Sequence, residues 1–382
     1  MAEVALNSAL EKQKWLSNYF GEYVRQSGFK PYMGTTNNDV IIVKRELQEE
    51  AGKTINIPLI TRLRGSGVTG SQVLDGNEED LGNYNCALSV DWRRHGVKIP
   101  KSTSYKTEID LWGAAKQMLR KWESEQLRND IIKALLSIVP ATTTVTPTNY
   151  GDITLIAAAS GGGYEITAAN QAAGASEANK DAWLVLNADR VLFGALRANA
   201  VSLDHSTALA TCDTTADKLS TVIGSLAKDM AMLADPHITP FQTEDGREYF
   251  VMFCNQRSFR DLKADTVMTA ANRDARPRDV DSNPLFQDGD LVYDGIIYRR
   301  IPEIPIITAA GSSTDIGPNF LCGAQALGVA WGQQPTFQTD MQKDYKFRPG
   351  VAIEELLRVQ KLHFNGVQQG IVTVYTAAAA NG

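Results

Sequence analysis

Apolar residues recur at helical spacing along one long segment of the chain, from Thr107 to Ile138. Thr107 and Asp110 provide a capping-box-like start for a helix, and Pro140 follows its end. At about 1.5 Å per residue, the segment predicts a helix roughly 48 Å long. Its apolar stripe consists of Ile109, Trp112, Ala115, Leu119, Trp122, Leu127, Ile131, Leu135 and Ile138. We therefore expect one face of this helix, Trp122 included, to be buried.

Shorter patterns fill the first hundred residues. The spacing of apolar residues from Val4 to Ser27 predicts an amphipathic helix, and an extended arm should follow it from Phe29 to Asp39. Two β-branched runs predict strands at Val40–Val43 and Thr54–Ile60. A polar, glycine-rich stretch then runs from Arg62 to Asn85, before alternation resumes over Cys86–Pro100. The arrangement predicts a long β-hairpin or loop with a tip of about 20 residues.

The remaining pattern is mixed. Residues 141–180 are rich in small and polar types and predict a surface excursion. Later segments predict strands at Trp183–Leu186, Tyr249–Cys254 and within Asp288–Pro305, and helices near Asn187–Asn199, Thr215–Leu233 and Gln256–Lys263. The last strands, Leu356–Phe364 and Ile371–Thr376, flank Asn365-Gly366, which is a hairpin signal. The order of elements predicts an α+β chain in which at least one domain is discontinuous.

Composition narrows the function classes. The 382 residues suffice for two to three domains, and 43% hydrophobic with 21% charged residues is ordinary globular usage. A net charge of −6 argues against tight binding to nucleic-acid phosphates. The first residues lack the basic start of a signal peptide and no apolar run approaches a membrane span, so we expect a cytosolic chain. The four cysteines lie far apart and are expected to be buried free thiols.

The strongest enzyme-like pattern is Gly65-x-Gly67-x-x-Gly70, which fits a dinucleotide fingerprint after the Thr54–Ile60 strand. The fingerprint requires a helix to begin at the third glycine, whereas Ser71–Gly82 has no helical period and contains the run Glu78-Glu79-Asp80, which would repel phosphate. We expect a glycine-rich mobile loop here and no cofactor.

Two other groups contain residue types found in active or metal sites. Asp204-His205-Ser206 has the residue types of a catalytic triad, but neighbours in sequence rarely face one another, and we expect a solvated loop. Asp288, Asp290 and Asp294 fall short of a calcium-loop pattern. No catalytic or metal site is therefore predicted. The long arm, hairpin and helix, with an acidic balance, are typical of a protein that binds copies of itself.

Specific residues carry a family resemblance. The stretch Ile57–Leu81, together with Lys14-Trp15, Gly52–Ile55 and the helix through Trp122, resembles the major capsid proteins of tailed bacteriophages. The resemblance implies the Hong Kong 97-like capsid fold. By position it implies an N-terminal arm over 1–39, a peripheral P-domain over 40–140, an axial A-domain over 141–310 with an insertion at 141–180, and return strands to the P-domain over 311–382. Within the P-domain, it implies an extended E-loop at about 55–101 and a spine helix at 107–138.

The same resemblance implies a function. Copies of the chain would assemble as hexamers and pentamers into an icosahedral shell around double-stranded DNA, with no enzymatic activity and no cofactor. Portal and scaffolding or cement proteins would be further partners, the DNA contacts would be weak and non-specific, and no membrane would be involved. The chain would be found in the virion capsid after assembly in the bacterial host cytoplasm. A nucleotide-dependent enzyme using the glycine loop and a tail or baseplate protein remain the alternatives.

Charged residues near the hairpin are the candidate contacts between subunits. Acidic residues at the loop tip could pair with basic residues of a neighbouring copy and so fix the register of one subunit on another. The acidic candidates are Glu78, Glu79 and Asp80, and the basic candidates are Arg62, Arg64, Arg93 and Arg94.

Overall fold

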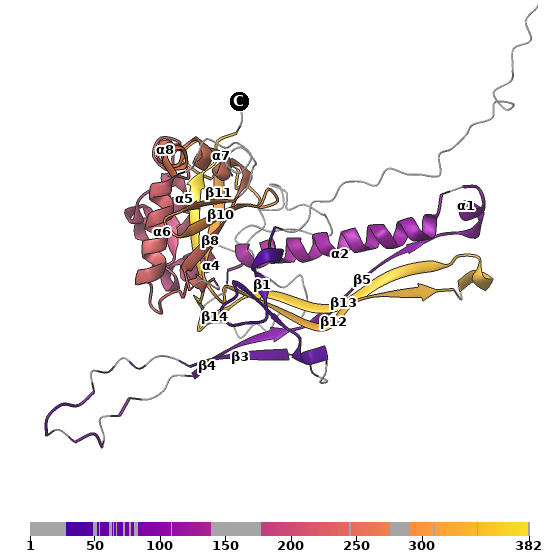
Figure 1. The fold of residues 1–382 in the computed structure, drawn as a ribbon, viewed down its shortest axis with the longest axis horizontal. Helices are drawn as coiled ribbons and strands as arrows, with labels where there is room; N and C mark the ends of the chain where they lie inside the picture. Colours follow the sequence, from indigo (N-terminus) through magenta and orange to yellow (C-terminus); the bar gives the residue numbers. More distant parts are fainter. Residues whose placement is uncertain are drawn as a thin grey trace, which may run out of the picture.

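The computed structural model describes residues 28–48, 52, 54–60, 63, 65, 67–71, 73–75, 78–79, 83–107, 109–138, 177–243, 246–275, 290–308, 310–341 and 343–380. The expected helix over Val4–Ser27 and the excursion over 141–176 lie outside these residues. The described residues form two parts, an elongated platform and a more compact globular part (Figure 1). None of their helices is both long and apolar enough to cross a membrane.

The platform is a five-stranded sheet with one long helix on it. Its strand order is β1-β2-β12-β13-β5. The strands are β1 (Met33–Gly34), β2 (Ile41–Lys44), β5 (Asp91–Lys98), β12 (Leu327–Asp340) and β13 (Gly350–Lys361). Because β13 pairs with β12 on one side and β5 on the other, the end of the chain completes a sheet that the first hundred residues begin.

The long helix, α2 (Leu111–Leu136), is shorter than the predicted 107–138 segment. Its N-cap is Asp110, whose carboxylate accepts hydrogen bonds from the N–H groups of Trp112 and Gly113, whereas the Thr107 hydroxyl accepts from Ile109 outside the helix. Ser137 is extended and ends it. The buried face of α2 packs on β13 through Ala115 and Leu119 in its first half and through Ile131, Ile132 and Leu135 in its second half. The stripe therefore placed the helix correctly, and its ends differ by a few residues.

Trp122 is only half-buried, which corrects the expectation of full burial. Its ring stacks on His95 of β5, with 4.6 Å between ring centroids. We expect Trp122→Ala to lower the free energy of unfolding by about 2 kcal/mol, less than the 3–5 kcal/mol of a fully buried tryptophan. Urea denaturation of the unassembled subunit measures this difference. A loss above 4 kcal/mol would contradict partial burial and show that the Trp122 side chain is fully buried in the dissolved subunit.

The globular part contains a larger sheet, with strand order β6-β16-β11-β8-β10-β9 and β7 beside β8. Its strands are β6 (Val191–Phe193), β7 (Phe241–Gln242), β8 (Glu248–Cys254), β9 (Leu291–Tyr293), β10 (Ile296–Arg300), β11 (Ile316–Cys322) and β16 (Ile371–Ala377). The helices packed around it are α4 (Glu177–Leu186), α5 (His205–Thr211), α6 (Thr221–Leu233), α7 (Gln256–Ala264) and α8 (Thr266–Ala275), as Figure 1 shows. Every residue of β11 and β16 is buried, so helices or loops cover the centre of this sheet on both faces.

Local patterns in the globular part predicted some elements and misplaced others. The strand at Tyr249–Cys254 and the helix at Gln256–Lys263 are confirmed by β8 and α7. The predicted strand at Trp183–Leu186 is wrong, because these residues end helix α4. The predicted helix over Asn187–Asn199 is also wrong: Val191–Phe193 pair with β16 as strand β6. The helix predicted from Thr215 begins only after Ser220, whose hydroxyl caps α6.

The Asn365-Gly366 signal marks a real but much smaller hairpin. Both residues have positive φ, 51° and 80°, as a tight turn of the I′ type requires. The turn joins β14 (His363–Phe364) to β15 (Val367–Gln368). The long strands on either side do not pair with each other, since β13 belongs to the platform and β16 to the globular sheet. The hairpin is therefore the crossing point between the two parts.

Buried polar contacts hold this crossing point together. The ammonium of Lys361, at the end of β13, is fully buried and donates to the carbonyl oxygen of Ser137, 3.0 Å away, and to Oε1 of Gln368, 2.6 Å away. Burial lowers the pKa of Lys361 to about 7. Lys361 thus joins the end of α2 to the small hairpin. All four cysteines are free and buried, as predicted.

The remaining pair of strands forms a hairpin below the platform (Figure 1). β3 (Thr54–Ile60) and β4 (Asn83–Ser89) pair antiparallel over their full length, so the predicted hairpin is present. Its second arm is not Cys86–Pro100 as predicted, because Asp91–Lys98 leave the hairpin and pair with β13 as β5. Residue Phe29, at the start of the expected arm, is buried and packs edge-on against Phe253, with 4.8 Å between ring centroids. The segment after it therefore adheres to the body of the molecule, since Met33–Gly34 add a short strand beside β2.

Candidate functional site

The glycine loop lacks the geometry of a dinucleotide site. Gly67 and Gly70 have positive φ, 67° and 66°, and Gly70 lies in a turn rather than at the start of a helix. A carboxylate oxygen of Glu79 accepts a hydrogen bond from the Gly65 N–H at 2.5 Å. The Glu79 carboxylate thus takes up a backbone N–H group that a bound phosphate would need. Among the described residues of this loop, nothing favours a nucleotide.

Asp204-His205-Ser206 does not form a triad, and it does not form the solvated loop that we expected. Asp204 caps α5, and its carboxylate accepts from the Ser206 hydroxyl at 3.0 Å. The His205 ring is buried, with Nε2 3.2 Å from the Tyr375 hydroxyl. Burial lowers the pKa of His205 to about 4, so the ring is neutral at physiological pH. The serine hydroxyl and the imidazole therefore have different partners, and the group is structural.

The acidic residues also have structural partners. Asp290 pairs with Arg299 at 2.9 Å and Asp294 pairs with Lys228 at 3.0 Å, while Asp288 lies outside the described residues. One cluster in the described ranges brings carboxylate oxygens within 4.8 Å of one another: Glu177, Asp181 and Asp204. These carboxylates accept hydrogen bonds from backbone N–H groups at the start of α5. Capping a helix accounts for them.

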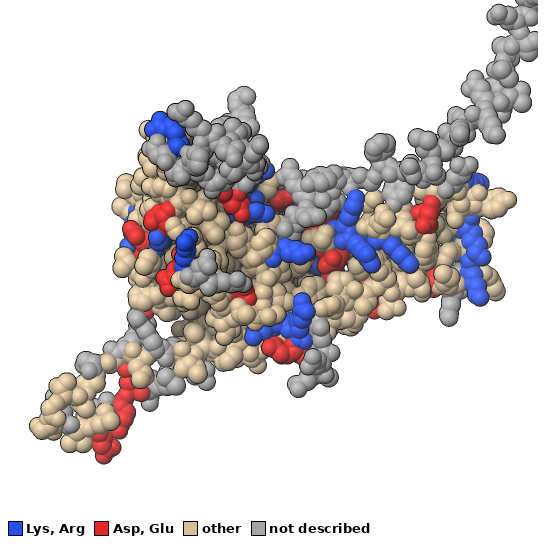
Figure 2. Space-filling model, viewed as in Figure 1, with Lys and Arg blue, Asp and Glu red and all other residues tan. Residues whose placement is uncertain are grey.

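Exposed patches are the clearest surface features of the described residues. The end of β3 and the loop that follows it have several apolar side chains that are more than half exposed: Ile60, Leu63, Val73 and Leu74. Glu78 and Glu79, the described acidic candidates, are exposed on the same loop. Figure 2 shows acidic residues along the projecting loop. Exposed apolar groups beside charges are typical of a surface that is covered by another protein.

The basic candidates differ in their surroundings. Arg93 is turned toward α2, where its Nε lies 2.5 Å from Glu355 Oε1 and its Nη1 contacts the Asp130 carboxylate. The side chains of Asp130 and Glu355 are 5% and 1% exposed. Because this pair accounts for Arg93 inside the platform, we do not carry it forward as a contact between subunits. Arg94 is exposed, on the other face, in register with Glu354, and stays a prediction. Arg62, Arg64 and Asp80 lie outside the described residues.

A second surface was not predicted from the sequence. It lies at the far end of the platform, where α1 (Lys101–Tyr105) meets the connection between β12 and β13 through a hydrogen bond from the Lys101 N–H to the Phe347 carbonyl, 3.0 Å long. We call it the distal end and define it by its exposed members: Lys98, Lys101, Tyr105, Lys106, Met341, Tyr345, Lys346, Phe347 and Arg348. The only sign of this surface in the sequence is that aromatic residues occur inside polar segments that contain lysines. These residues follow no helical or strand period, so the pattern does not place them together.

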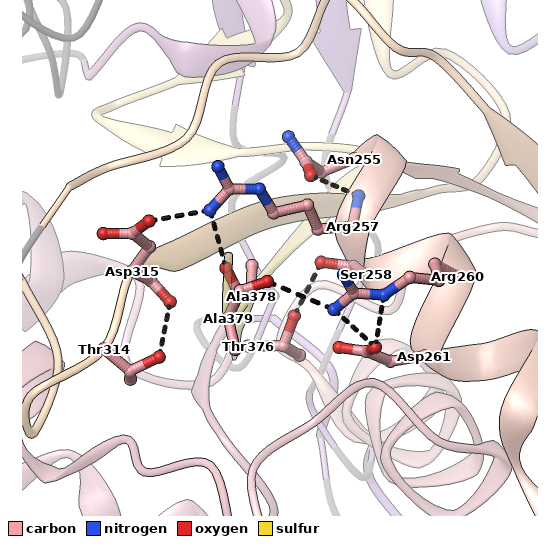
Figure 3. Close-up of polar contacts among 10 residues, drawn as sticks. All are labelled: Asn255, Arg257, Ser258, Arg260, Asp261, Thr314, Asp315, Thr376, Ala378 and Ala379. Atoms are coloured by element: carbon pink, nitrogen blue, oxygen red, sulfur yellow. Dashed lines mark hydrogen bonds and ion pairs between the residues drawn. The ribbon is translucent and has the colours of Figure 1, made fainter. Parts of the chain in front are cut away.

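Sequence reasoning also missed the anchoring of the chain after β16 (Figure 3). Arg257 of α7 donates to the Asp315 carboxylate at 2.7 Å and to the Ala378 carbonyl at 3.1 Å. Arg260, one turn further along α7, donates to the Ala379 carbonyl at 3.1 Å. Two arginines of one helix thus hold the last described residues against the globular part.

Three comparisons with known proteins bear on the family and the fold. The family model described as phage capsid protein matches residues 3–380. The major capsid protein of Pseudomonas phage KPP25 is 23% identical over 386 aligned positions, which cover 96% of this chain and 95% of that protein. The capsid subunit of cyanophage Pam1 is 40% identical with a TM-score of 0.85, and each chain is fully covered. The capsid of Ralstonia phage GP4 matches with a TM-score of 0.70 at 21% identity, covering 100% of this chain and 99% of that one.

Proposed function

Because the chain belongs to the phage capsid protein family, we propose that it is the major capsid protein of a tailed double-stranded DNA bacteriophage, assembling as hexamers and pentamers into the icosahedral shell around the genome. The observation that carries this proposal is the full-length likeness to the cyanophage Pam1 capsid subunit. The fold is the Hong Kong 97-like capsid fold, as the resemblance implied. A projecting hairpin with exposed apolar residues also supports self-association, because such residues are typical of a surface covered by another protein.

Within this proposal the parts of the fold take the roles that the resemblance implied. The hairpin β3–β4 with its loop serves as the E-loop, α2 as the spine helix, and the platform as the P-domain. The globular part serves as the axial A-domain. Of the strands in the predicted return segment 311–382, β12 and β13 lie in the platform, whereas β11 and β16 belong to the globular sheet. The contacts of β13 with both β5 and α2 support a P-domain built from the two ends of the chain.

The charge distribution supports weak contacts with packaged DNA. The net charge is −6, and Figure 2 shows basic and acidic residues interspersed on the globular part. A shell with a net negative charge would let the genome slide during packaging, because it does not hold the phosphates tightly. Portal and scaffolding or cement proteins are the further partners we propose, with assembly in the host cytoplasm and the virion as the final location. No enzymatic activity is part of this role.

Electron microscopy of the purified protein, expressed alone and with the neighbouring structural genes, tests the proposal. Closed shells or capsomers are the expected result, with buried area per interface above the ~2,000 Å² of obligate contacts. Tubes or rings would instead favour a tail or baseplate protein. A stable small oligomer that binds nucleotides would favour the enzyme.

Hydrogen exchange tests the role of the loop. We expect amides of Gly65–Gly82 to exchange rapidly in unassembled subunits and slowly in shells, because the exposed Leu63 and Leu74 would be covered by another copy on assembly. The amides of β8 in the core provide the internal reference, since they should be protected in both states. Equal protection of the loop before and after assembly contradicts the idea.

Charge reversal tests the acidic run. We expect the triple variant Glu78→Lys, Glu79→Lys, Asp80→Lys to fold normally and fail to assemble, because like charges would then meet across the interface. The defect should weaken at high salt, where the Debye length falls from about 10 Å at 0.1 M to about 3 Å at 1 M. Circular dichroism and particle counts measure the two effects. Normal particle counts at low salt would show that the run faces solvent.

A further inference from the structure

Positive charge is concentrated on one part of the platform. From Asp91, where β5 begins, to Lys121 the sequence contains eight lysines and arginines and three acids, whereas the whole chain contains 38 and 44. Figure 2 shows lysine and arginine side chains along α2 and at the far end of the platform, while both signs are mixed on the globular part. The net charge of −6 therefore averages over a local excess of positive charge.

Three of these cations lie on the first three turns of α2. We call them the basic strip: Lys116, Arg120 and Lys121. Arg120 is exposed, and the two lysines are partly exposed. The strip lies outside the buried stripe of Ala115 and Leu119, which pack against the sheet. Its side chains can therefore reach a partner outside the subunit.

The acids of α2 and its N-cap are engaged away from the strip. Asp110 is the N-cap, so its carboxylate accepts hydrogen bonds from the first N–H groups of the helix. Burial raises the pKa of Glu123, which lies beside Arg93 between the helix and the sheet. Glu125 lies 3.9 Å from Arg128, further along the helix. The strip thus retains its excess of positive charge.

An aromatic ring of the sheet holds Arg120 in place. The central carbon of its guanidinium lies 5.4 Å from the centroid of the Phe337 ring of β12. Such a cation–π contact orients the cation without using its N–H donors. A guanidinium can bind one phosphate through two parallel N–H···O bonds. Arg120 is therefore positioned to bind a phosphate.

The outward face of α2 is better suited to phosphates than to a protein partner. All residues of α2 are described, and none of them is among the exposed large apolar residues. The positions next to the cations are the small or polar Gly113, Gln117 and Ser124. A protein interface depends on apolar or aromatic anchors at its centre, whereas sequence-independent binding to DNA is electrostatic.

We propose that the basic strip is the surface through which the subunit contacts the phosphate backbone of packaged double-stranded DNA. The proposal rests on the capsid function proposed above and names the surface that makes the weak contact. Three cations displace few counter-ions, so each contact is weak and independent of base sequence. Many copies in one shell repeat the contact along the genome. The acidic remainder of the chain keeps the total attraction low.

Acetylation of lysines in wild-type particles tests the contact without any substitution. Lys116 and Lys121 should react several-fold more slowly in DNA-filled particles than in particles that have released their DNA, as mass spectrometry measures. Lys30 and Lys218, which are exposed elsewhere, are the reference, and their reactivity should not depend on DNA.

Three results of this experiment overturn the DNA contact. Equal protection of the strip in filled and emptied particles would show that another protein surface covers it. Equal and high reactivity in both would show that the strip faces solvent. A DNA-dependent change at Lys30 and Lys218 as large as that at the strip would show that the strip has no special part in the contact.

Charge neutralisation provides the second arm, with unassembled subunits and a fluorescent duplex of about 30 base pairs. The variant Lys116→Gln, Arg120→Gln, Lys121→Gln should bind about tenfold more weakly at about 50 mM salt. The slope of log K against log salt should fall by about 2.7, because each phosphate contact contributes about 0.9. Circular dichroism should show an unchanged fold.

The matched control removes the same charges from exposed positions elsewhere: Lys30→Gln, Arg197→Gln, Lys218→Gln. It should change the slope by less than about 1. Equal losses for the two variants overturn the assignment to the strip and leave the capsid function intact. Absence of any wild-type assembly overturns the capsid function itself and the DNA contact with it.

Discussion

Replacing Arg93 with methionine is expected to lower the free energy of unfolding by about 3–5 kcal/mol, because it removes the guanidinium that contacts two buried carboxylates. Arg93 bridges Asp130 of α2 and Glu355 of β13, and so ties the long helix to the sheet. Burial raises the pKa of Asp130, and it raises the pKa of Glu355 to about 7 even with the guanidinium beside it. Methionine retains much of the aliphatic volume, so the loss reports the charge.

The pH dependence supplies a signature of this role. A carboxyl whose pKa is higher in the folded state binds a proton there that the unfolded chain has lost, so the contribution of Glu355 to stability should fall as pH rises from about 4.5 to about 7. In Arg93→Met the decline should extend to higher pH. Arg94→Met, exposed on the other face of the same strand, is the control and should change stability by less than about 0.5 kcal/mol. Equal losses for the two variants, measured by urea denaturation from pH 5 to 8, would contradict the assignment.

Trp183→Ala is expected to destabilise the subunit by about 3–5 kcal/mol, through lost burial and the cavity that remains. The indole is completely buried between α4 and the globular sheet, with its ring centroid 6.0 Å from that of His205. The change should lower the yield of soluble subunits before it alters any particle.

Val185→Ala on the same helix is the matched control, since its side chain is 56% exposed. It should be close to neutral, because alanine has the higher helix propensity. Thermal unfolding of unassembled subunits compares the two. If Trp183→Ala melts with Val185→Ala, the indole lies in solvent and α4 is packed differently.

Elements with a complete local signal were predictable. Helix α2 has its stripe, its cap and a terminating segment, and the β3–β4 hairpin has two β-branched or alternating runs about a polar loop. Their patterns extend over many residues, so one exception does not change the period. The buried strand β8 and helix α7 follow the same rule on a smaller scale.

Elements that depend on distant partners were not predictable. The four apolar residues from Trp183 to Leu186 fit the end of a helix as well as a short strand. The mostly polar residues before them, from Glu177 on, form the rest of α4. Val191–Phe193 are extended because they pair with Thr373–Tyr375, which come much later in the chain. No local window contains that information.

The candidate surfaces show the same limit. The acidic loop was visible as a run of charges, whereas the adjacent Arg93 and Arg94 were indistinguishable. Strand alternation turns one arginine toward α2 and the other away, and only the position of the helix decides which is covered. The distal end is assembled from two segments that meet only when β13 lies beside β5.

The pairing of β13 with β5 also delays folding of the platform during synthesis. Arg93 and Glu355 are 262 residues apart, and at 5–20 residues per second a ribosome needs roughly 13–50 s to make the second after the first. Until then α2 and β5 wait without the strand on which they pack, and the distal end does not exist. A nascent chain that has not yet reached β13 therefore cannot present the complete distal end.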